Sequence, residues 1–204
     1  MRNKIVVFGD SITFGAWDKE CGGWVNRLRL SVDNDTRIEK SHVFNMGISG
    51  QVTEEILDRI DDECRRRIRD DAKNTVILAA GINDTQVIRG EIRVPEGEFR
   101  YNVRSLIRRA QRYADNVLYV GLTRVDESRT SPWAGDRTKT WKNALIERYD
   151  RIIEEICDEE GADYIRMLEV TDPMSNYDGL HPDAEGHRRI AEAVRTRIDG
   201  YLGL

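Results

Sequence analysis

Short apolar runs alternate along this chain with longer segments in which apolar residues recur at the spacing of a helix. The candidate strands cover residues 4–8, 43–46, 75–80, 117–121 and 164–168. Most of these runs are nearly continuous in Val, Ile, Leu and aromatic residues, which is typical of strands buried on both faces of a sheet. The pattern therefore predicts five buried strands.

The segments between and after these strands have one apolar face each, as expected for amphipathic helices. The apolar faces comprise Ile56, Leu57, Ile60, Cys64 and Ile68; Phe99, Val103, Leu106, Ile107 and Ala110; Trp141, Leu145, Ile152, Ile153 and Ile156; and, after Pro182, Ile190, Val194 and Ile198. Gly161 is a candidate C-cap of the third helix. Alternating strands and helices predict a doubly wound α/β fold, with a parallel sheet and right-handed crossovers.

The chain has 204 residues and shows neither an internal repeat nor a low-complexity linker, so we expect one domain over residues 1–204. Two runs of arginine, at residues 65–67 and 108–109, fall on predicted helices whose other faces are apolar. We interpret both runs as solvated faces paired with Asp and Glu.

The formal net charge of −5 argues against nucleic acid or an anionic membrane as the partner, because both need a basic surface. The cysteines Cys21, Cys64 and Cys157 are odd in number and form no CxxC pattern, which is typical of a reduced, intracellular chain. No targeting segment and no run of about 18 apolar residues is present, so a cytoplasmic protein without a membrane span is expected.

Three predicted loops, residues 83–95, 123–138 and 169–182, follow strands and should emerge at the carboxyl edge of the sheet. Ligands bind at this edge in open α/β folds. Ser11, in the stretch GDSITFG, also follows a strand and shares this edge. A serine that attacks an acyl carbon needs a base, a group that orients the base, and donors for the oxyanion.

The chain contains three histidines as candidate bases. His42 opens the second strand at the opposite edge of the sheet and is interpreted as structural. His187 lies inside the last helix, one turn after Asp183, and is expected to be exposed. His181, in YDGLHP, lies on a loop at the carboxyl edge and precedes Pro182 at a helix start, so it is the best candidate base.

Asp178 precedes His181 by three residues and is separated from it by Gly179, which permits a tight turn. This spacing can place the carboxylate against Nδ1 of His181 and leave Nε2 facing Ser11. Asp-Gly is also a common turn pair in its own right. Asp172 is a competing candidate for the acid, because it lies on the same loop.

The oxyanion donors are expected at the ends of two further strands, in NMGISG and AAGINDT. The candidate donors are the backbone N–H groups of Ser11 and Gly47 and the side-chain amide of Asn83. Asp10 and Asp84 are interpreted as supports that hydrogen-bond loop amides and order Ser11 and Asn83.

Together, the blocks GDSITFG, NMGISG, GINDT and DGLHP resemble those of the SGNH, or GDSL-type, hydrolase family, and the resemblance covers essentially the whole chain. It implies a three-layer α/β/α sandwich of the flavodoxin-like type. It also implies Ser11 as nucleophile, His181 as base and Asp178 as its partner. Ser11 N–H, Gly47 N–H and Asn83 would form the oxyanion hole.

The activity implied is hydrolysis of a carboxylic ester through an acyl-enzyme, without a metal or organic cofactor. A short acyl group such as acetyl is expected, because no lipid-binding insertion is evident. Trp133 is a candidate pocket wall, with Ile48, Val87 and Ile88 as further lining residues. Acyl transfer to a sugar or other alcohol is one alternative, and a non-catalytic acyl or carbohydrate binder is another.

Other functions of α/β proteins lack their motifs in this sequence. Neither the G-x-x-x-x-G-K-[ST] loop for phosphate nor G-x-G-x-x-G for a dinucleotide follows the first strand. A metal site at Asp183 and His187 lacks a third ligand. A small-molecule ester is therefore the expected partner.

Overall fold

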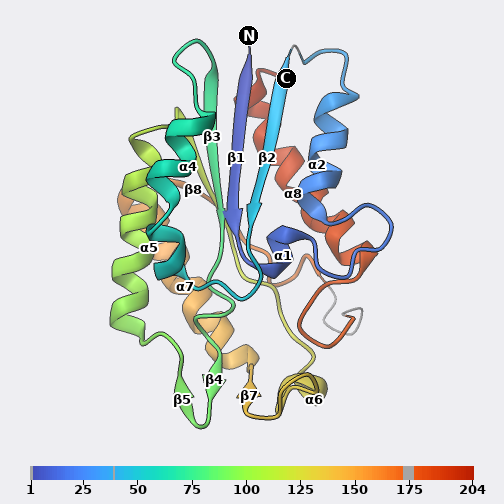
Figure 1. Cartoon of the computed structure of the whole chain (residues 1–204), viewed down its shortest axis with the longest axis vertical. Helices are drawn as coiled ribbons and strands as arrows, with labels where there is room; N and C mark the ends of the chain where they lie inside the picture. The colour runs from blue at the N-terminus through green and yellow to red at the C-terminus, as the bar shows by residue number, and fades with distance from the viewer. Residues whose placement is uncertain (1, 39, 172–176) are drawn as a thin grey trace.

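The central sheet consists of parallel strands only (Figure 1). The structure is a computed structural model, and it describes residues 2–38, 40–171 and 177–204. The strands of this sheet are β1 (Asn3–Gly9), β2 (Ser41–Gly47), β3 (Lys73–Ala79), β6 (Asn116–Val120) and β8 (Asp163–Ile165). Their order in the sheet is β2-β1-β3-β6-β8, which is the flavodoxin-like order when only these strands are counted along the chain. The predicted doubly wound, five-stranded parallel sheet is confirmed.

Helices cover both faces of this sheet and make the fold a three-layer α/β/α sandwich (Figure 1). The helices are α1 (Ser11–Phe14), α2 (Trp24–Asp33), α3 (Thr53–Leu57), α4 (Ile60–Arg67), α5 (Glu96–Gln111), α6 (Glu127–Thr130), α7 (Asn143–Glu160) and α8 (Ala184–Leu202). Helices α2 and α8 pack on one face, and α3, α4, α5 and α7 pack on the other.

The alternation of side chains along β1 explains why one strand supplies both cores. Ile5 and Val7 point to the core under α2 and α8, whereas Val6 and Phe8 point to the core under α4 and α5. All four side chains are almost completely buried. Such burial on both faces is the reason that β1 appears in the sequence as a continuous apolar run.

Several boundaries differ from the sequence prediction. The helix expected around residues 56–68 is two helices, α3 and α4, and α2 was not predicted. The predicted strand 164–168 stops at Ile165 in β8, although Leu168 beyond it is buried. Trp141 lies before α7 rather than on it, and its Nε1–H donates to Ile82 O at 3.0 Å. Gly161, by contrast, is the predicted C-cap, with φ 68°.

A second, small antiparallel sheet has two strands within the segment 83–95, which the sequence predicted as irregular, and one strand directly after the predicted loop 123–138. Its strands are β4 (Val87–Ile88), β5 (Glu91–Ile92) and β7 (Lys139–Thr140), in the order β5-β4-β7. Strands of two residues are too short to show an apolar period, so the sequence gives no signal for them.

The arginine runs lie on solvated helix faces as predicted. Arg65 pairs with Asp62, Arg67 pairs with Glu63, and Arg108 pairs with Glu160. Over the described part of the chain, no helix has both the length and the apolar character needed to cross a membrane.

Candidate active site

The turn after β1 requires glycine on both sides of Ser11. A Cβ atom on Gly9 would lie 2.3 Å from the carbonyl oxygen of Ala79 on the neighbouring strand. Gly15 ends α1 with φ 101°, and a Cβ atom there would lie 2.1 Å from Gly22 O. Both glycines therefore allow the backbone around Ser11 to pack tightly, and Ser11 itself begins α1.

The Ser11 hydroxyl lies against the imidazole of His181. Ser11 Oγ is 2.9 Å from His181 Nε2, although the two residues are 170 positions apart in the sequence. His181 Nδ1 lies 2.8 Å from Asp178 Oδ2. Because a carboxylate accepts from Nδ1–H, Nε2 carries no proton in the neutral ring and accepts from the Ser11 hydroxyl.

The loop between Asp178 and His181 holds this arrangement through its backbone. Asp178 Oδ1 accepts from the backbone N–H groups of Leu180, at 3.0 Å, and of His181, at 2.9 Å. Gly179 has φ 89°, so the turn depends on glycine. Burial opposes ionisation of Asp178, but its hydrogen bonds and charge interaction with His181 hold its pKa below the usual value. Asp178 is thus a carboxylate at neutral pH. The competing candidate, Asp172, lies outside the described residues.

The two further oxyanion candidates differ in their hydrogen bonds. Gly47 N–H donates to Asn45 Oδ1 at 2.9 Å, and a Cβ atom on Gly47 would lie 2.2 Å from Phe14 N. Gly47 therefore packs against α1 with its N–H already engaged. Asn83 Nδ2 donates one of its two N–H groups to Gln51 O at 3.0 Å. The second N–H of this amide remains as a candidate donor to an oxyanion.

Gly50, three residues after Gly47, is a further candidate donor that the sequence analysis did not name. It lines the same cavity as Ser11 and Asn83, whereas Gly47 does not. Among the residues that the structure describes, neither Gly50 N–H nor Ser11 N–H donates a hydrogen bond. Gly50 belongs to the same block, NMGISG, as Gly47, so the sequence signal that indicated Gly47 also includes Gly50.

Asp10 and Asp84 are buried carboxyl groups that order the backbone near the site. Asp10 accepts from Ile12 N–H at 2.9 Å and caps α1. Asp84 accepts from both the backbone N–H and the hydroxyl of Thr53, at the start of α3. These hydrogen bonds order the start of α3. The sequence prediction was instead that Asp84 supports Asn83. Burial raises the pKa of Asp10 to about 6 and that of Asp84 to about 7.

Ser11 and His181 lie at the wall of a cavity of about 330 Å³. The cavity is lined by Ser11, Ala16, Trp17, Ser49, Gly50, Asn83, Gln86, Arg93, Trp133, Lys139, Trp141, Leu180 and His181. Of the predicted pocket residues only Trp133 is in this set. Ile48 is 46% exposed, and Val87 and Ile88 form β4 beside the cavity. The lining also includes Trp17, which the sequence did not single out.

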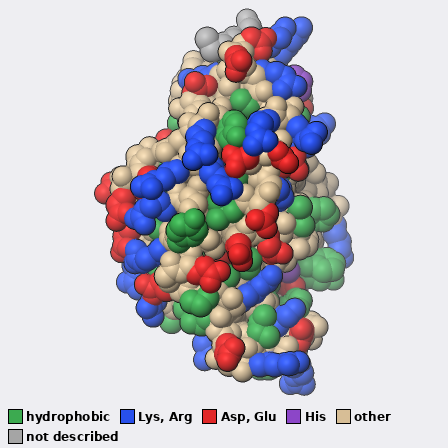
Figure 2. Space-filling view, turned by 60° about the vertical axis from the view of Figure 1, so that its left-hand side comes forward, with side chains coloured by type: hydrophobic (Ala, Val, Ile, Leu, Met, Phe, Trp, Pro, Cys, Tyr) green, Lys and Arg blue, Asp and Glu red, His purple; other side chains and the backbone are tan. Residues whose placement is uncertain are grey.

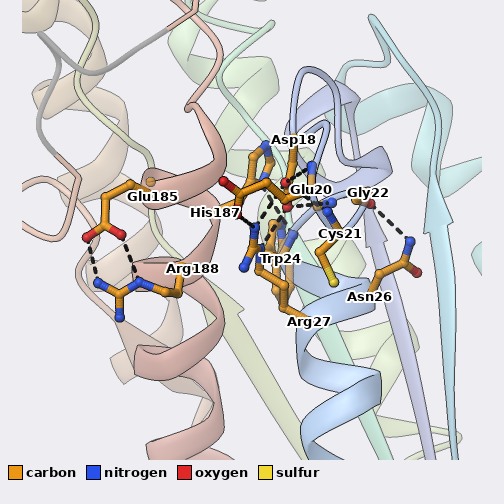
Figure 3. A network of polar contacts seen from close by, with 12 residues as sticks. Asp18, Glu20, Cys21, Gly22, Trp24, Asn26, Arg27, Glu185, His187 and Arg188 are labelled. Carbon is orange, nitrogen blue, oxygen red and sulfur yellow. Dashed lines mark hydrogen bonds and ion pairs between the residues drawn. The ribbon is translucent and has the colours of Figure 1, made fainter.

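His187 is buried, which contradicts the prediction that it is exposed. Its Nδ1 accepts from Trp24 N–H at 3.2 Å, and its Nε2–H donates to Ala16 O at 3.1 Å. The prediction failed because α2 and the loop before it, distant in sequence, cover this side of α8 (Figure 3). Burial lowers the pKa of His187, so the ring is neutral.

The loop that His187 contacts is also held by Asp18. This carboxylate accepts from the backbone N–H groups of residues 20, 21 and 23 and from the guanidinium of Arg27 (Figure 3). Burial opposes ionisation of Asp18, but Arg27 and these N–H groups hold its pKa well below the usual value. The network fixes the segment that places Ala16 and Trp17 at the cavity.

Asp183 caps α8 by accepting from Gly186 N–H at 2.9 Å. The carboxylate of Asp183 therefore stabilises the start of α8, whereas His187 bonds to Trp24 and Ala16. In residues 2–38, 40–171 and 177–204, no cluster of three or more His, Cys, Asp or Glu side chains is arranged to hold a metal ion.

The three-layer sandwich, with a hydroxyl, an imidazole and a carboxylate in contact at the carboxyl edge of its sheet, defines a hydrolase-like α/β enzyme. The model of the GDSL-like lipase/acylhydrolase family matches residues 7–189. The chain belongs to this family and is a carboxylic ester hydrolase.

Solved structures of similar fold include other enzymes of this kind. A lipase/acylhydrolase from Enterococcus faecalis has 22% identity and a TM-score of 0.77, with 98% of this chain and 97% of that chain covered. An acetylxylan esterase from Geobacillus stearothermophilus has 20% identity and a TM-score of 0.73, with 96% and 93% covered. An α/β hydrolase from the metagenome of Lake Arreo has 20% identity and a TM-score of 0.73, with 95% and 93% covered. No curated protein matches the chain.

Proposed function

We propose that this enzyme hydrolyses esters of short carboxylic acids through an acyl-enzyme on Ser11. The observation that carries the proposal is the line of contacts from Ser11 Oγ to His181 Nε2, at 2.9 Å, and from His181 Nδ1 to Asp178 Oδ2, at 2.8 Å. A hydroxyl, an oriented neutral imidazole and a carboxylate in this order activate a serine for attack on a carbonyl carbon.

In the first half-reaction, Ser11 Oγ attacks the ester carbonyl carbon while His181 Nε2 takes the hydroxyl proton. The tetrahedral intermediate collapses when His181 gives this proton to the leaving alcohol, and the acyl group remains on Ser11. In the second half-reaction, His181 takes a proton from water as the water attacks the acyl carbon. The acid then leaves, and the proton returns to Ser11 Oγ.

The oxyanion of both intermediates would accept hydrogen bonds from three donors. We assign these to Ser11 N–H, to Gly50 N–H and to the second N–H of Asn83 Nδ2. The assignment replaces Gly47 by Gly50, because Gly50 lines the cavity and Gly47 N–H donates to Asn45. Removing one such donor typically lowers kcat by about 10²–10³.

Variants of the acetylxylan esterase support these roles. In structures described as catalytic mutants of that protein, a serine, an aspartate and a histidine are each replaced by alanine. The aspartate precedes the histidine by three residues there, as Asp178 precedes His181 here.

The acyl group is proposed to be acetyl or of similar size. The cavity of about 330 Å³ is walled by the indoles of Trp133 and Trp141, which pack edge to face with ring centres 5.6 Å apart. Trp17, 46% exposed, lies at the same cavity and presents an aromatic surface to the alcohol part of the ester. An acetylated sugar is compatible with such a surface.

A panel of p-nitrophenyl esters with acetyl, butyryl and octanoyl groups tests this proposal. We expect kcat/KM to be highest for the acetate and to fall with each extension of the chain. Acetylated xylose derivatives, assayed by acetate release, extend the panel to sugar alcohols. A kcat/KM that rises with chain length would contradict the acyl assignment, and absence of turnover on every ester would contradict the reaction itself.

A further inference from the structure

A second hollow, of about 490 Å³, lies across the small sheet from the active-site cavity. It is lined by Val87, Arg89, Gly90, Ser131, Pro132, Arg137, Thr138, Thr140 and Lys142. Alternate residues of a strand point to opposite faces. Accordingly, Thr138 and Thr140 line the hollow, whereas Lys139 and Trp141 line the cavity above Ser11.

The lining of the hollow is cationic, although one carboxylate, that of Asp136, lies beside it and accepts from Thr138. Arg89, Arg137 and Lys142 line it, and no Asp or Glu does. Through their side chains, these three residues form no ion pair or hydrogen bond with the described residues. Elsewhere on the surface arginines are commonly paired, as Arg104 and Arg108 are with Glu160. Figure 2 shows Lys and Arg side chains, with some Asp and Glu side chains among them, at the lower end of the molecule, where Figure 1 places β4, β5 and β7.

The backbone at Arg89 provides a second, independent observation. The β4–β5 hairpin turns through Arg89 and Gly90, which have φ values of 52° and 92°. Two consecutive positive φ values are the requirement of a type I′ turn, whose first position favours Asn, Asp or Gly. Arginine is unfavourable there, and residues held in such conformations cluster at ligand-binding sites. The position of Arg89 therefore points to a role for its side chain.

The hollow also offers neutral donors beside the charges. Ser131 and Thr140 contribute hydroxyl groups that can donate to an oxygen atom. The hollow thus offers two guanidinium groups, one ammonium group and two hydroxyls. This set matches a tetrahedral or planar oxyanion, because one guanidinium group can donate two parallel N–H hydrogen bonds to such an anion. The chain has a net charge of −5, so this local positive charge does not follow from its composition.

We propose that this hollow binds an oxyanion group, namely a phosphate, sulfate or carboxylate, next to the ester-cleaving cavity. The anion is either free or part of the ester substrate, and only the second case rests on the proposed function. In that case the substrate is an ester whose acyl or alcohol part extends around β7 and ends in a negative charge.

Titration with inorganic phosphate at constant ionic strength tests the site without any enzymatic reaction. The dissociation constant is measured by calorimetry for the wild type, for Arg137→Gln/Lys142→Gln and for Arg89→Asn. We expect both variants to bind phosphate at least about tenfold more weakly. Arg89→Asn should also melt at the same temperature as the wild type or higher, because asparagine favours the turn.

The matched control is Arg66→Gln/Arg151→Gln, which removes two cations that lie outside the hollow and have no ion-pair partner among the described residues. This control should bind phosphate as the wild type does. If Arg137→Gln/Lys142→Gln binds phosphate with wild-type affinity, or if the control loses as much affinity, the proposal is overturned.

The source of the anion is resolved with two esters, phenyl acetate and 4-acetoxyphenyl phosphate. If the anion belongs to the substrate, Arg137→Gln/Lys142→Gln lowers kcat/KM for the phosphate ester about tenfold relative to phenyl acetate. If this ratio is unchanged while phosphate binding is lost, the site takes a free anion. Should the enzyme cleave neither ester, the proposed function fails and the phosphate titration still decides the site.

Discussion

The main sheet and the small sheet contribute different parts of one cavity. Ser11 follows β1 and Asn83 follows β3, and these strands pair with each other in register over seven residues. Lys139 lies on β7, which pairs with β4 through only two residues. The comparison indicates that the long strands position Ser11 and Asn83, whereas the short strands position part of the cavity wall.

The largest effect is expected at Ser11, on the main sheet. Ser11→Ala removes the atom that we propose forms the acyl-enzyme, so it should lower kcat for p-nitrophenyl acetate by about 10⁴-fold or more. Circular dichroism and the melting temperature should remain close to wild type. Ser49→Ala, at the other serine of the cavity, is the matched comparison and should retain most of the activity. Equal losses of kcat in Ser11→Ala and Ser49→Ala would contradict the assignment of Ser11 as the nucleophile.

His181 and Asp178 test the same edge of the sheet. His181→Ala should be as damaging as Ser11→Ala, because the residues act as a unit. Asp178→Asn should lower kcat by up to about 10⁴-fold, since it no longer fixes the proton on Nδ1. Asp172→Asn, at the competing acid, should leave kcat near wild type. A larger loss for Asp172→Asn than for Asp178→Asn would move the acid to residue 172.

Asn83→Ala should have an intermediate effect. Loss of its amide removes one proposed oxyanion donor, so kcat should fall by about 10²–10³ with little change in KM. Its hydrogen bond to Gln51 O is lost as well, so the melting temperature is measured in parallel. A rise in KM with unchanged kcat would indicate a role in substrate binding instead.

The wall of the cavity should show a change in selectivity rather than a loss of rate. Trp133→Ala enlarges the cavity next to the small sheet and should raise the ratio of kcat/KM for butyrate over acetate by roughly tenfold. The kcat for p-nitrophenyl acetate should stay within a few-fold of wild type. A loss of kcat comparable to that of Asn83→Ala would contradict the prediction that Trp133, next to the small sheet, affects selectivity and not the rate.

The smallest effect is expected at His187, which supports the loop at the cavity without facing it. The pKa of His187 is lowered by burial, so the unfolded chain takes up a proton near pH 6.5 that the folded chain does not. Stability is therefore lost as the pH falls through this range. In His187→Gln the amide can replace both hydrogen bonds, to Trp24 N–H and Ala16 O, without titrating. The fall in melting temperature from pH 8 to pH 5 should be smaller in the variant than in the wild type.

The sequence predicted those parts of the fold in which burial leaves a periodic pattern. The central strands β1, β3 and β6 contain continuous apolar runs because both of their faces are covered, and all five predicted strands are present in the main sheet. The small sheet has strands of two residues, which carry no period. His187 looked exposed because its cover, the segment before α2, comes from the other end of the chain.

At the site, the sequence predicted residue types and their order but not individual hydrogen bonds. The contacts of Ser11 with His181 and of His181 with Asp178 follow from chain order and the shared edge of the sheet. The choice between Gly47 and Gly50 depends on the side chain of Asn45, whose orientation no spacing predicts. Likewise, Trp17 reaches the cavity through a loop conformation with φ 70° that is unusual for a bulky residue.

The most direct measurement is mass spectrometry of the enzyme quenched in acid during turnover of p-nitrophenyl acetate. The account predicts an acetyl group on the peptide that contains Ser11 and on no other peptide, and none in Ser11→Ala. An active enzyme that carries the acetyl group on a different residue, or a Ser11→Ala variant that is acetylated and still turns over, would contradict it.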